Sequence, residues 1–305
     1  MTINDIFQSD RKNPIVIALG FFDCVHIGHR KLIEETKQLA KKMKAESAVF
    51  TFNTKESKFK KSNEIYNFFE REYILDELGV DRIVYASLND EFASLSGDSF
   101  LKLLFKNFHI VGIVCGADYR YGKNAKSNVS DLAEFAAGYN AKVIIENFVT
   151  YEGEKVSTTM LADILSYGDL SVANELLGEP YFILNKVESD FKRGRKFGCP
   201  TINVHVDNKV KLRDGVYATI FEFEKQKYAS ITNVGTKPTF NDSNYTVETH
   251  VLNFNREIYG ELVKVSFLKY IRPIRKFSSP DELKKQIDID AQVAQKIFNS
   301  GENKG

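Results

Sequence analysis

Two histidines flanking a glycine form the most chemically suggestive pattern in this 305-residue chain. They occur near the start, in the string His26-Ile27-Gly28-His29. Imidazoles can hydrogen-bond phosphate oxygens and stabilise the charge that develops when a nucleotide bond breaks. The two histidines are three residues apart, so on a helix they can face one ligand. Gly28 between them has no side chain, so the backbone can approach that ligand closely. The pattern favours nucleotidyl transfer.

The residues on either side indicate how the histidines are positioned. A buried strand is expected over 15–19, and apolar residues recur at helical spacing from Leu32 to Met43. The motif therefore joins a strand to a helix N-terminus, whose N–H groups and positive dipole end suit a phosphate. Two alternatives are less favoured: a pair of plain surface histidines, and a zinc pair, for which the sequence offers no further Cys or His cluster.

Composition and charge narrow the class of protein. Forty-two basic and 41 acidic residues give a net charge of +1, so no broad field recruits nucleic acid or an acidic membrane. The three cysteines are odd in number and far apart, which is typical of a reduced cytosol rather than a disulfide scaffold. No apolar run approaches membrane-spanning length, and residues 1–13 are too polar for a secretory signal. We therefore expect a soluble cytoplasmic protein. Its oligomeric state is not indicated.

A change of pattern near residue 180 predicts two domains, 1–178 and 179–305. In the first, apolar strands alternate with helices, which is typical of an α/β fold with a doubly wound parallel sheet. The strands are expected over 15–19, 47–52, 81–86, 110–115 and 142–147. Ligands of such sheets bind at the carboxyl ends of the strands, where His29 and the loop after Cys115 fall. A helical connection is expected over 160–177.

In the second domain the apolar residues alternate with a period of two, which is typical of antiparallel strands. These strands are expected over 215–223, 227–234, 247–254 and 262–269. Several strands at such short spacing predict a small antiparallel β-barrel, because closure removes exposed edges. A closing helix is expected over 280–298.

The second domain carries its own chemical pattern between Lys192 and Asn203. A basic loop with glycines can surround phosphates with N–H donors and cationic side chains. Thr201 and Asn203 are two residues apart, so in an extended segment they point to one face, where their oxygens suit Mg²⁺ bridged to a nucleotide. A turn followed by a strand is the alternative, and it is the favoured one for this string alone.

Glu248 shifts the balance toward phosphoryl transfer. It is predicted in mid-strand on the same face as Leu252 and Phe254, and a carboxylate on an apolar face is costly unless it is paired or functional. It could accept the proton of an attacking hydroxyl while Mg²⁺ and the basic loop neutralise the transferred group. A glutamate salt-bridged in the barrel mouth is the alternative.

Taken in order, these motifs resemble those of one family. The order is Gly-x-Phe-Asp-x-Val-His-x-Gly-His, then Gly-Arg-x-x-Gly-x-Pro-Thr-x-Asn, then Val-Glu-x-His and Ile-Arg. It is similar to the bacterial bifunctional riboflavin kinase/FMN adenylyltransferases, or FAD synthetases, over nearly the whole chain. The resemblance implies that the barrel phosphorylates riboflavin to FMN with ATP and Mg²⁺. It also implies that the first domain adenylylates FMN to FAD.

The resemblance assigns roles to individual residues. It implies that Glu248, His26 and His29 are catalytic, that Thr201 and Asn203 hold Mg²⁺, and, more loosely, that Arg272 contacts the flavin. It implies ATP or phosphate contacts for Gly28, Asp118, Ser157, Thr158, Gly194, Arg195, Gly198, Thr201 and Asn203.

Two departures from the family pattern fall in the first domain. Ala162 stands where the pattern Ser-Ser-Thr/Ser-x-Ile-Arg has an arginine that reaches the ATP phosphates, so we expect FAD synthesis to be slow or absent. Lys155 or Lys123 could substitute for it in space. Cys24 replaces the usual glycine of the histidine turn, a smaller change.

Four functions therefore stay open. They are the bifunctional enzyme, a riboflavin kinase with a silent first domain, a nucleotidyltransferase for another phosphorylated alcohol, and a non-catalytic flavin-binding regulatory paralogue. The kinase motifs argue against the third, and the complete set Thr201, Asn203 and Glu248 argues against the fourth.

Overall fold

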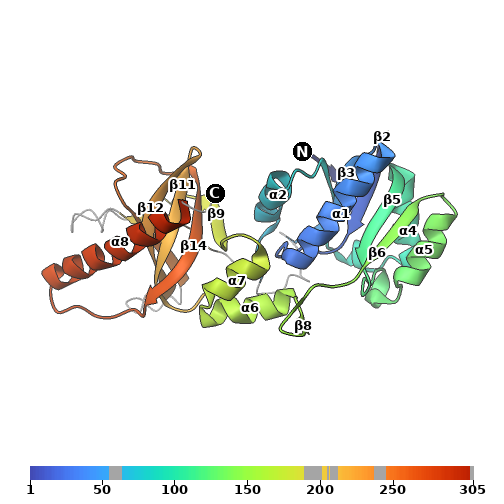
Figure 1. Ribbon diagram of the computed structural model, residues 1–305. Helices are drawn as coiled ribbons and strands as arrows, with labels where there is room; N and C mark the ends of the chain where they lie inside the picture. Colours follow the sequence, from blue (N-terminus) through green and yellow to red (C-terminus); the bar gives the residue numbers. More distant parts are fainter. Residues whose placement is uncertain (55–63, 189–200, 205, 207–211, 237–244, 303–305) are drawn as a thin grey trace. The chain divides into compact units, whose positions relative to one another are not determined.

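The computed structural model describes residues 1–305 except 55–63, 189–200, 205, 207–211, 237–244 and 303–305. The chain forms two compact units, Met1–Thr158 and Thr159–Gly305 (Figure 1). The predicted connection is two helices, α6 (Thr158–Tyr167) and α7 (Leu170–Leu177). Because α7 packs against β14 (Leu262–Arg272), it belongs to the second unit. The predicted domain boundary between residues 178 and 179 stays a prediction.

The first unit is built on a parallel six-stranded sheet with the order β1-β4-β3-β2-β5-β6. Its strands are β1 (Thr2–Asp5), β2 (Asp10–Leu19), β3 (Glu46–Asn53), β4 (Arg82–Ser87), β5 (Phe108–Gly116) and β6 (Lys142–Glu146). Its helices are α1 (Ile27–Met43), α2 (Phe68–Glu77), α3 (Asp90–Ala93), α4 (Gly97–Asn107) and α5 (Val129–Ala137). The predicted doubly wound α/β fold is confirmed.

The central strand β2 shows why the sheet is covered on both faces. Ile15, Ile17 and Leu19 pack in the cluster formed with α4 and α5, whereas Val16 packs with Leu39 of α1. A strand that is buried on both sides needs apolar residues at every position, so residues 15–19 form one continuous apolar run. The run ends at Leu19, directly before the histidine loop.

The second unit is an antiparallel six-stranded sheet with the order β10-β13-β12-β11-β14-β9. Its other strands are β9 (Phe182–Lys186), β10 (Thr201–Val204), β11 (Gly215–Phe223), β12 (Gln226–Thr236) and β13 (Tyr245–Val251). The sheet curls into a half-barrel whose two edge strands meet at the bridge between Val187 and Val204. The small antiparallel barrel predicted from the sequence is confirmed in this form.

The closing helix α8 (Pro280–Glu302) covers one face of this sheet (Figure 1). Ile287, Ala294 and Ile297 pack against residues of β11 and β12, among them Ala218 and Ile231. These helix residues are spaced by seven and three positions, which places them on one apolar face and explains why the sequence predicts the helix. Among the described residues, none of the helices is both long and apolar enough to cross a membrane.

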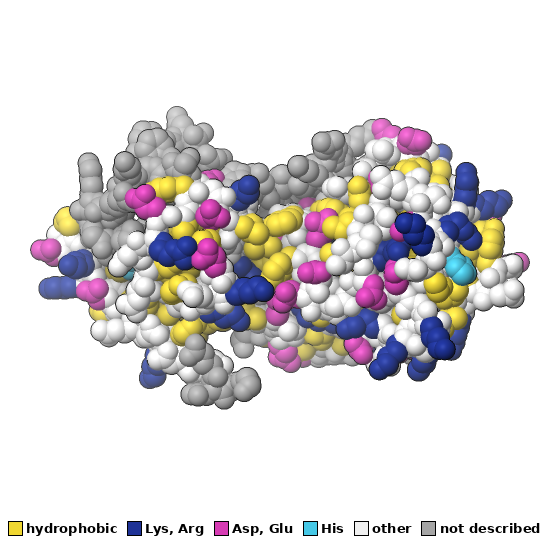
Figure 2. Space-filling view, turned by 90° about the horizontal axis from the view of Figure 1, so that it is seen from above, with side chains coloured by type: hydrophobic (Ala, Val, Ile, Leu, Met, Phe, Trp, Pro, Cys, Tyr) yellow, Lys and Arg dark blue, Asp and Glu magenta, His cyan; other side chains and the backbone are white. Residues whose placement is uncertain are grey.

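Several elements differ from the expected pattern. The predicted helix over 160–177 breaks where Gly168 takes a left-handed backbone (φ 82°), and Asp169 then caps α7. A hairpin of β7 (Thr150–Tyr151) and β8 (Glu154–Lys155) precedes α6. Strand β1 was not expected, since its sequence TIND has one strongly apolar residue and pairing with β4 alone defines it. Basic and acidic side chains are interspersed on the face in Figure 2, in keeping with the small net charge.

Candidate functional site

The loop between β2 and α1 places both histidines at the start of the helix. Phe22 and Val25 in this loop take left-handed backbone conformations (φ 53° and 44°), although neither is glycine. Such a conformation is costly, particularly for a β-branched residue. Both side chains are fully buried (0% exposed), so tertiary packing holds the loop in this shape.

A buried arginine ties the same loop to the neighbouring strand end. The guanidinium of Arg71 donates to the carbonyl oxygens of Phe21 (3.1 Å) and Phe52 (2.8 Å) and to the hydroxyl of Thr51 (2.7 Å). The Thr51 hydroxyl in turn donates to the carbonyl of Phe21 (2.6 Å). Burial lowers the pKa of Arg71, and the carboxylate of Asp23 opposes this effect. The sequence does not mark Arg71, because its partners are distant in the chain and are mostly backbone atoms.

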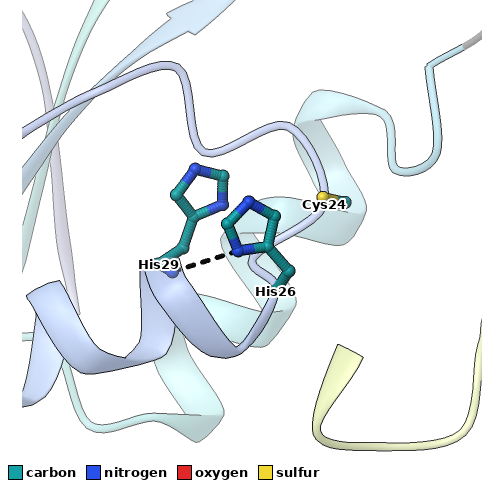
Figure 3. Close-up of side chains that lie close together, drawn as sticks. All are labelled: Cys24, His26 and His29. Atoms are coloured by element: carbon teal, nitrogen blue, oxygen red, sulfur yellow. Dashed lines mark hydrogen bonds between the residues drawn. The ribbon is translucent and has the colours of Figure 1, made fainter. Parts of the chain in front are cut away.

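The two histidines form a stacked pair. The Nδ1 atom of His26 accepts a hydrogen bond from the backbone N–H of His29 (3.3 Å) and so caps α1. A neutral imidazole that accepts at Nδ1 carries its proton on Nε2, which leaves an N–H donor for a ligand. The two rings lie 3.7 Å apart between centroids with planes 9° from parallel (Figure 3).

Both imidazoles are uncharged at neutral pH. Burial, together with a smaller effect of the nearby Lys155 ammonium, lowers the pKa of His26 to about 4. Burial also holds the pKa of His29 well below its usual value, with further contributions from His26, Lys155 and Arg71. The pair therefore offers hydrogen-bonding groups to a phosphate rather than fixed positive charges.

Gly28 lies between the histidines for a steric reason. A Cβ atom at this position would lie 3.0 Å from Cε1 and 3.1 Å from Nδ1 of His26. The His26 ring would therefore have to shift by a few tenths of an ångström to make room for any side chain. The glycine was expected because it brings the backbone close to a ligand, and it also makes room for the ring that caps the helix.

These groups open onto one cavity of about 730 Å³ within the first unit. The cavity lies at the carboxyl ends of β2, β3 and β5, where ligands of such sheets bind. The six predicted residues that line it are His26, Gly28, His29, Asp118, Ser157 and Thr158. The structure therefore brings together the residues of this half that the sequence places far apart.

One wall of the cavity is aromatic. Phe50, Phe52, Phe92, Phe100 and Tyr121 line it, and their ring centroids lie 5.1–6.3 Å apart in successive pairs. The volume and the mixture of aromatic and polar walls suit a nucleotide-sized or flavin-sized ligand. These rings were not predicted as site residues, since aromatic residues at strand and helix spacing look like ordinary core.

Cys24 raises the question of a metal centre beside the histidines. Potential ligand atoms of Cys24, His26 and His29 lie within 4.8 Å of one another, and Figure 3 shows the sulfur on the side of the His26 ring. Zinc needs ligand lone pairs that converge on the ion. Nδ1 of His26 already caps the helix, and the stacked rings hold their nitrogen lone pairs in nearly parallel planes. The three side chains fit a phosphate site lined by uncharged hydrogen-bonding groups better than they fit a metal site.

In the second unit, three predicted residues lie on adjacent strands. The pairing of β10 with β13 sets Asn203 opposite Glu248, and Thr201 opposite His250. Opposed residues of an antiparallel pair share a face, so a hydroxyl, an amide and a carboxylate project to one side of the sheet. Asn233 of β12 lies opposite Glu248 on the other flank and was not predicted.

The face that carries Glu248 is not the apolar face expected from the sequence. Strand β13 ends at Val251, so Leu252 and Phe254 lie beyond it and do not continue its alternation. Its buried positions are Val247, Thr249 and Val251, whereas Glu248 is half-buried among polar neighbours. The expected apolar surroundings of Glu248 are therefore wrong, and its alignment with Asn203 is what relates it to a site.

Three predicted loop residues, Gly194, Arg195 and Gly198, lie outside the described residues. Arg272, predicted to contact the flavin, ends β14 and forms a bidentate ion pair with Asp290 of α8. Its role toward a flavin stays a prediction. Ala162 lies on α6 four residues after Thr158, so the two positions share one face of the helix.

Comparison with known proteins covers both units. A family model described as FAD synthetase matches residues 8–160, and one described as riboflavin kinase matches residues 177–298. A bifunctional riboflavin kinase/FMN adenylyltransferase of Bacillus subtilis (strain 168) is 34% identical over 294 residues, 93% of each chain. One from Listeria monocytogenes is 32% identical and covers 93% of this chain and 92% of its own. A crystal structure from Streptococcus pneumoniae, described as a macrolide-efflux protein, has a TM-score of 0.84 at 31% identity, covering 97% of this chain and 99% of its own.

Proposed function

The chain belongs to the bifunctional riboflavin kinase/FMN adenylyltransferase family, and we propose that its two units divide the two reactions. The second unit transfers the γ-phosphoryl group of ATP to riboflavin, giving FMN and ADP. The first unit transfers AMP from ATP to FMN, giving FAD and pyrophosphate. The binding partners of the chain are these small molecules, and we expect it to bind neither nucleic acid nor a membrane. Its proposed location is the cytoplasm.

The kinase reaction is proposed to take place on the face shared by β10 and β13. There Glu248 accepts the proton of the ribityl hydroxyl as that oxygen attacks the γ-phosphorus. Asn203 lies directly opposite Glu248 in the strand pairing, so the base and the nucleotide-binding residue are neighbours. Asn233 flanks Glu248 on its other side and can orient the carboxylate.

The same face supports the proposal of a Mg²⁺ site. Thr201 and Asn203 supply hydroxyl and amide oxygens on the face that also carries the proposed base, Glu248. These are hard oxygen donors of the kind that Mg²⁺ prefers. When bound, Mg²⁺ would neutralise charge on the β- and γ-phosphates. The residues themselves hold the nucleotide against the base.

The adenylyltransferase reaction is proposed for the cavity of the first unit. The start of α1 offers backbone N–H groups and the positive end of the helix dipole, and His26 adds its Nε2–H donor. These donors stabilise the charge that grows on the α-phosphate and on the leaving pyrophosphate. The aromatic wall accommodates the flat rings of the substrates, while Ser157 and Thr158 complete the polar side.

The observation that carries the proposal is that two residue sets, predicted separately, each come together in one unit. The test is to incubate the protein with riboflavin, ATP and Mg²⁺ and to separate the flavins. We expect both FMN and FAD, with FAD formed more slowly because Ala162 supplies no cation. Glu248→Gln should strongly slow FMN formation yet still convert supplied FMN to FAD, whereas His29→Ala should still form FMN but lose FAD formation. Formation of neither flavin would contradict the proposal.

A second candidate is a riboflavin kinase whose first unit is silent. The alanine at position 162 favours it, because a cation expected near the phosphates is absent from that helix. Accumulation of FMN with no FAD, even when FMN is supplied, would identify this case. Thr158 starts α6 and lines the cavity, and position 162 lies four residues later on the same face of that helix. Ala162→Arg would therefore place a guanidinium on the face of α6 that carries Thr158.

A further inference from the structure

One lysine at the cavity of the first unit, Lys155, has no role in the reaction as proposed above. Lys155 ends the β7–β8 hairpin and is followed by Val156, which is 1% exposed and whose N–H donates to the carbonyl of Val149 (3.0 Å). The backbone of Lys155 is therefore held between a hairpin and a buried anchor. Its side chain lines the cavity together with Asp118 and Phe148.

Two contacts fix the direction of this side chain. The ammonium of Lys155 forms an ion pair with the carboxylate of Asp118, and it lies 5.6 Å from the centroid of the Phe148 ring. Both partners come from segments that line the cavity. The ammonium is thus held at the cavity wall.

The charge of Lys155 also acts on both histidines. The Lys155 ammonium lowers the pKa of His26 and of His29, so it lies close enough to influence the two rings together. With both imidazoles neutral, the histidine pair brings no positive charge of its own to a phosphate. Of the cationic side chains that line the cavity, Lys155 and Arg120, Lys155 is the one whose charge acts on both rings.

We propose that Lys155 binds the phosphates of the nucleotide in the adenylyltransferase cavity and neutralises the charge of the departing pyrophosphate. The inference rests on the proposed function of the first unit. Asp118 holds the ammonium when phosphates are absent and gives it up when they bind, which explains why a carboxylate stands at a phosphate site. The other lysine considered from the sequence, Lys123, lies on the turn Lys123–Ala125 and is not among the described residues that line this cavity.

The exchange of partners has a physical basis. Lys155 and Asp118 are 42% and 58% exposed, so their ion pair is screened by solvent and weakly held. A polyphosphate offers more negative charge than one carboxylate, and charge-assisted bonds to it strengthen as charge develops on the leaving group. The ammonium can therefore move between the two without disturbing the hairpin backbone.

The test compares Lys155→Ala and Lys155→Arg with the full-length wild-type protein, with FMN formation as the internal control. We expect Lys155→Ala to lower kcat/KM for FAD formation about 100-fold and Lys155→Arg to stay within about tenfold of wild type. FMN formation should be unchanged in both. The matched control is Lys102→Ala, which removes another exposed lysine paired with an aspartate, Asp98, in the same unit. FAD kinetics equal to wild type in Lys155→Ala would overturn the inference.

A second measurement separates this inference from the proposed function. Binding of inorganic pyrophosphate, followed by calorimetry, should weaken at least tenfold in Lys155→Ala and not in Lys102→Ala. If the wild-type protein makes no FAD yet loses pyrophosphate affinity with Lys155, the function fails and the phosphate role of Lys155 stands. Equal pyrophosphate affinity in wild type and Lys155→Ala would refute that role whatever the activity.

Discussion

The ion pair between Arg272 and Asp290 allows a predicted flavin contact to be distinguished from a structural one. The guanidinium of Arg272 reaches both carboxylate oxygens of Asp290, with distances of 3.1, 3.0 and 2.7 Å. Gln286 also donates to this carboxylate (2.7 Å). The side chains of Arg272 and Asp290 are only 18% and 2% exposed, so the pair joins β14 to α8 largely away from water.

The expected cost of breaking the pair follows from this burial. Arg272→Met leaves a buried carboxylate with Gln286 as its remaining side-chain donor, and losing one partner of a buried pair typically costs about 3–5 kcal/mol. A domain is stable by about 5–15 kcal/mol, so the second unit should lose a large part of its free energy of unfolding. For a unit of this size, we expect a fall in its melting temperature of about 10–15 °C.

The assay is urea unfolding of the full chain, followed by far-UV circular dichroism, with riboflavin turnover measured alongside. The matched control is the double variant Arg272→Met with Asp290→Leu, which removes both charges and should recover most of the lost stability. A loss below about 1 kcal/mol in the single variant would refute the reasoning. If the double variant is stable but turns over riboflavin poorly, Arg272 also contacts the flavin; unchanged turnover makes its role structural.

Four further outcomes are expected. Glu248→Gln should slow FMN formation by about 10²–10⁴-fold and leave riboflavin affinity near wild type, as steady-state and binding measurements would show. Gly28→Ala should lower FAD formation selectively, because its Cβ would lie 3.0 Å from the His26 ring. Burial lowers the pKa of His26 from its usual 6.5 to about 4 in the folded chain. The folded state therefore binds fewer protons than the unfolded state, and the free energy of unfolding falls as the pH drops below 6.5. His26→Gln should reduce the loss between pH 7 and pH 5 by about 2 kcal/mol in urea titrations. A fragment beginning at Gly178 should phosphorylate riboflavin alone, but it should melt lower than one beginning at Thr159.

The last of these outcomes depends on helix α7, which the shorter fragment lacks. Leu170, Ala173 and Leu176 of α7 are buried, and the side-chain amide of Asn174 donates to the carbonyl of Phe267 in β14 (2.9 Å). The sequence predicts a helix here but not which unit it packs on. That choice depends on contacts between residues nearly a hundred positions apart.

The predictable part of the fold is the part with local patterning. Strand β2 and helix α1 are marked by an apolar run and by helical spacing, and β11 coincides with its predicted range, Gly215–Phe223. The short strands β1 and β9 were missed, because each is defined mainly by its pairing with a distant partner. Position along the chain also misled the interpretation of Glu248, since the turn after Val251 ends the alternation that was extended to Phe254.

The candidate sites follow the same division. Motif spacing predicted His26, Gly28 and His29 and the set Thr201, Asn203 and Glu248, because each motif is local and chemically distinctive, whereas Asp118, Ser157 and Thr158 were implied by the resemblance to the family. It could not predict which of Lys155 and Lys123 lines the cavity, because the short hairpin of β7 and β8 places Lys155 there. It could not mark Asn233 either, because only the strand register sets that residue beside Glu248.

The histidine motif is therefore not a self-contained unit of function. Its loop includes Val25 in a left-handed conformation, and Arg71 of α2 holds the loop through the carbonyl of Phe21. The strain is local, whereas the groups that stabilise it come from another strand and another helix. The same strand, loop and helix placed on a sheet without Arg71 and Thr51 should relax, and the His26 cap and the stacked ring of His29 would then lose their common orientation. Arg71→Met should accordingly reduce FAD formation while leaving the kinase unit intact, and equal FAD formation would mean that the loop holds its shape without the arginine.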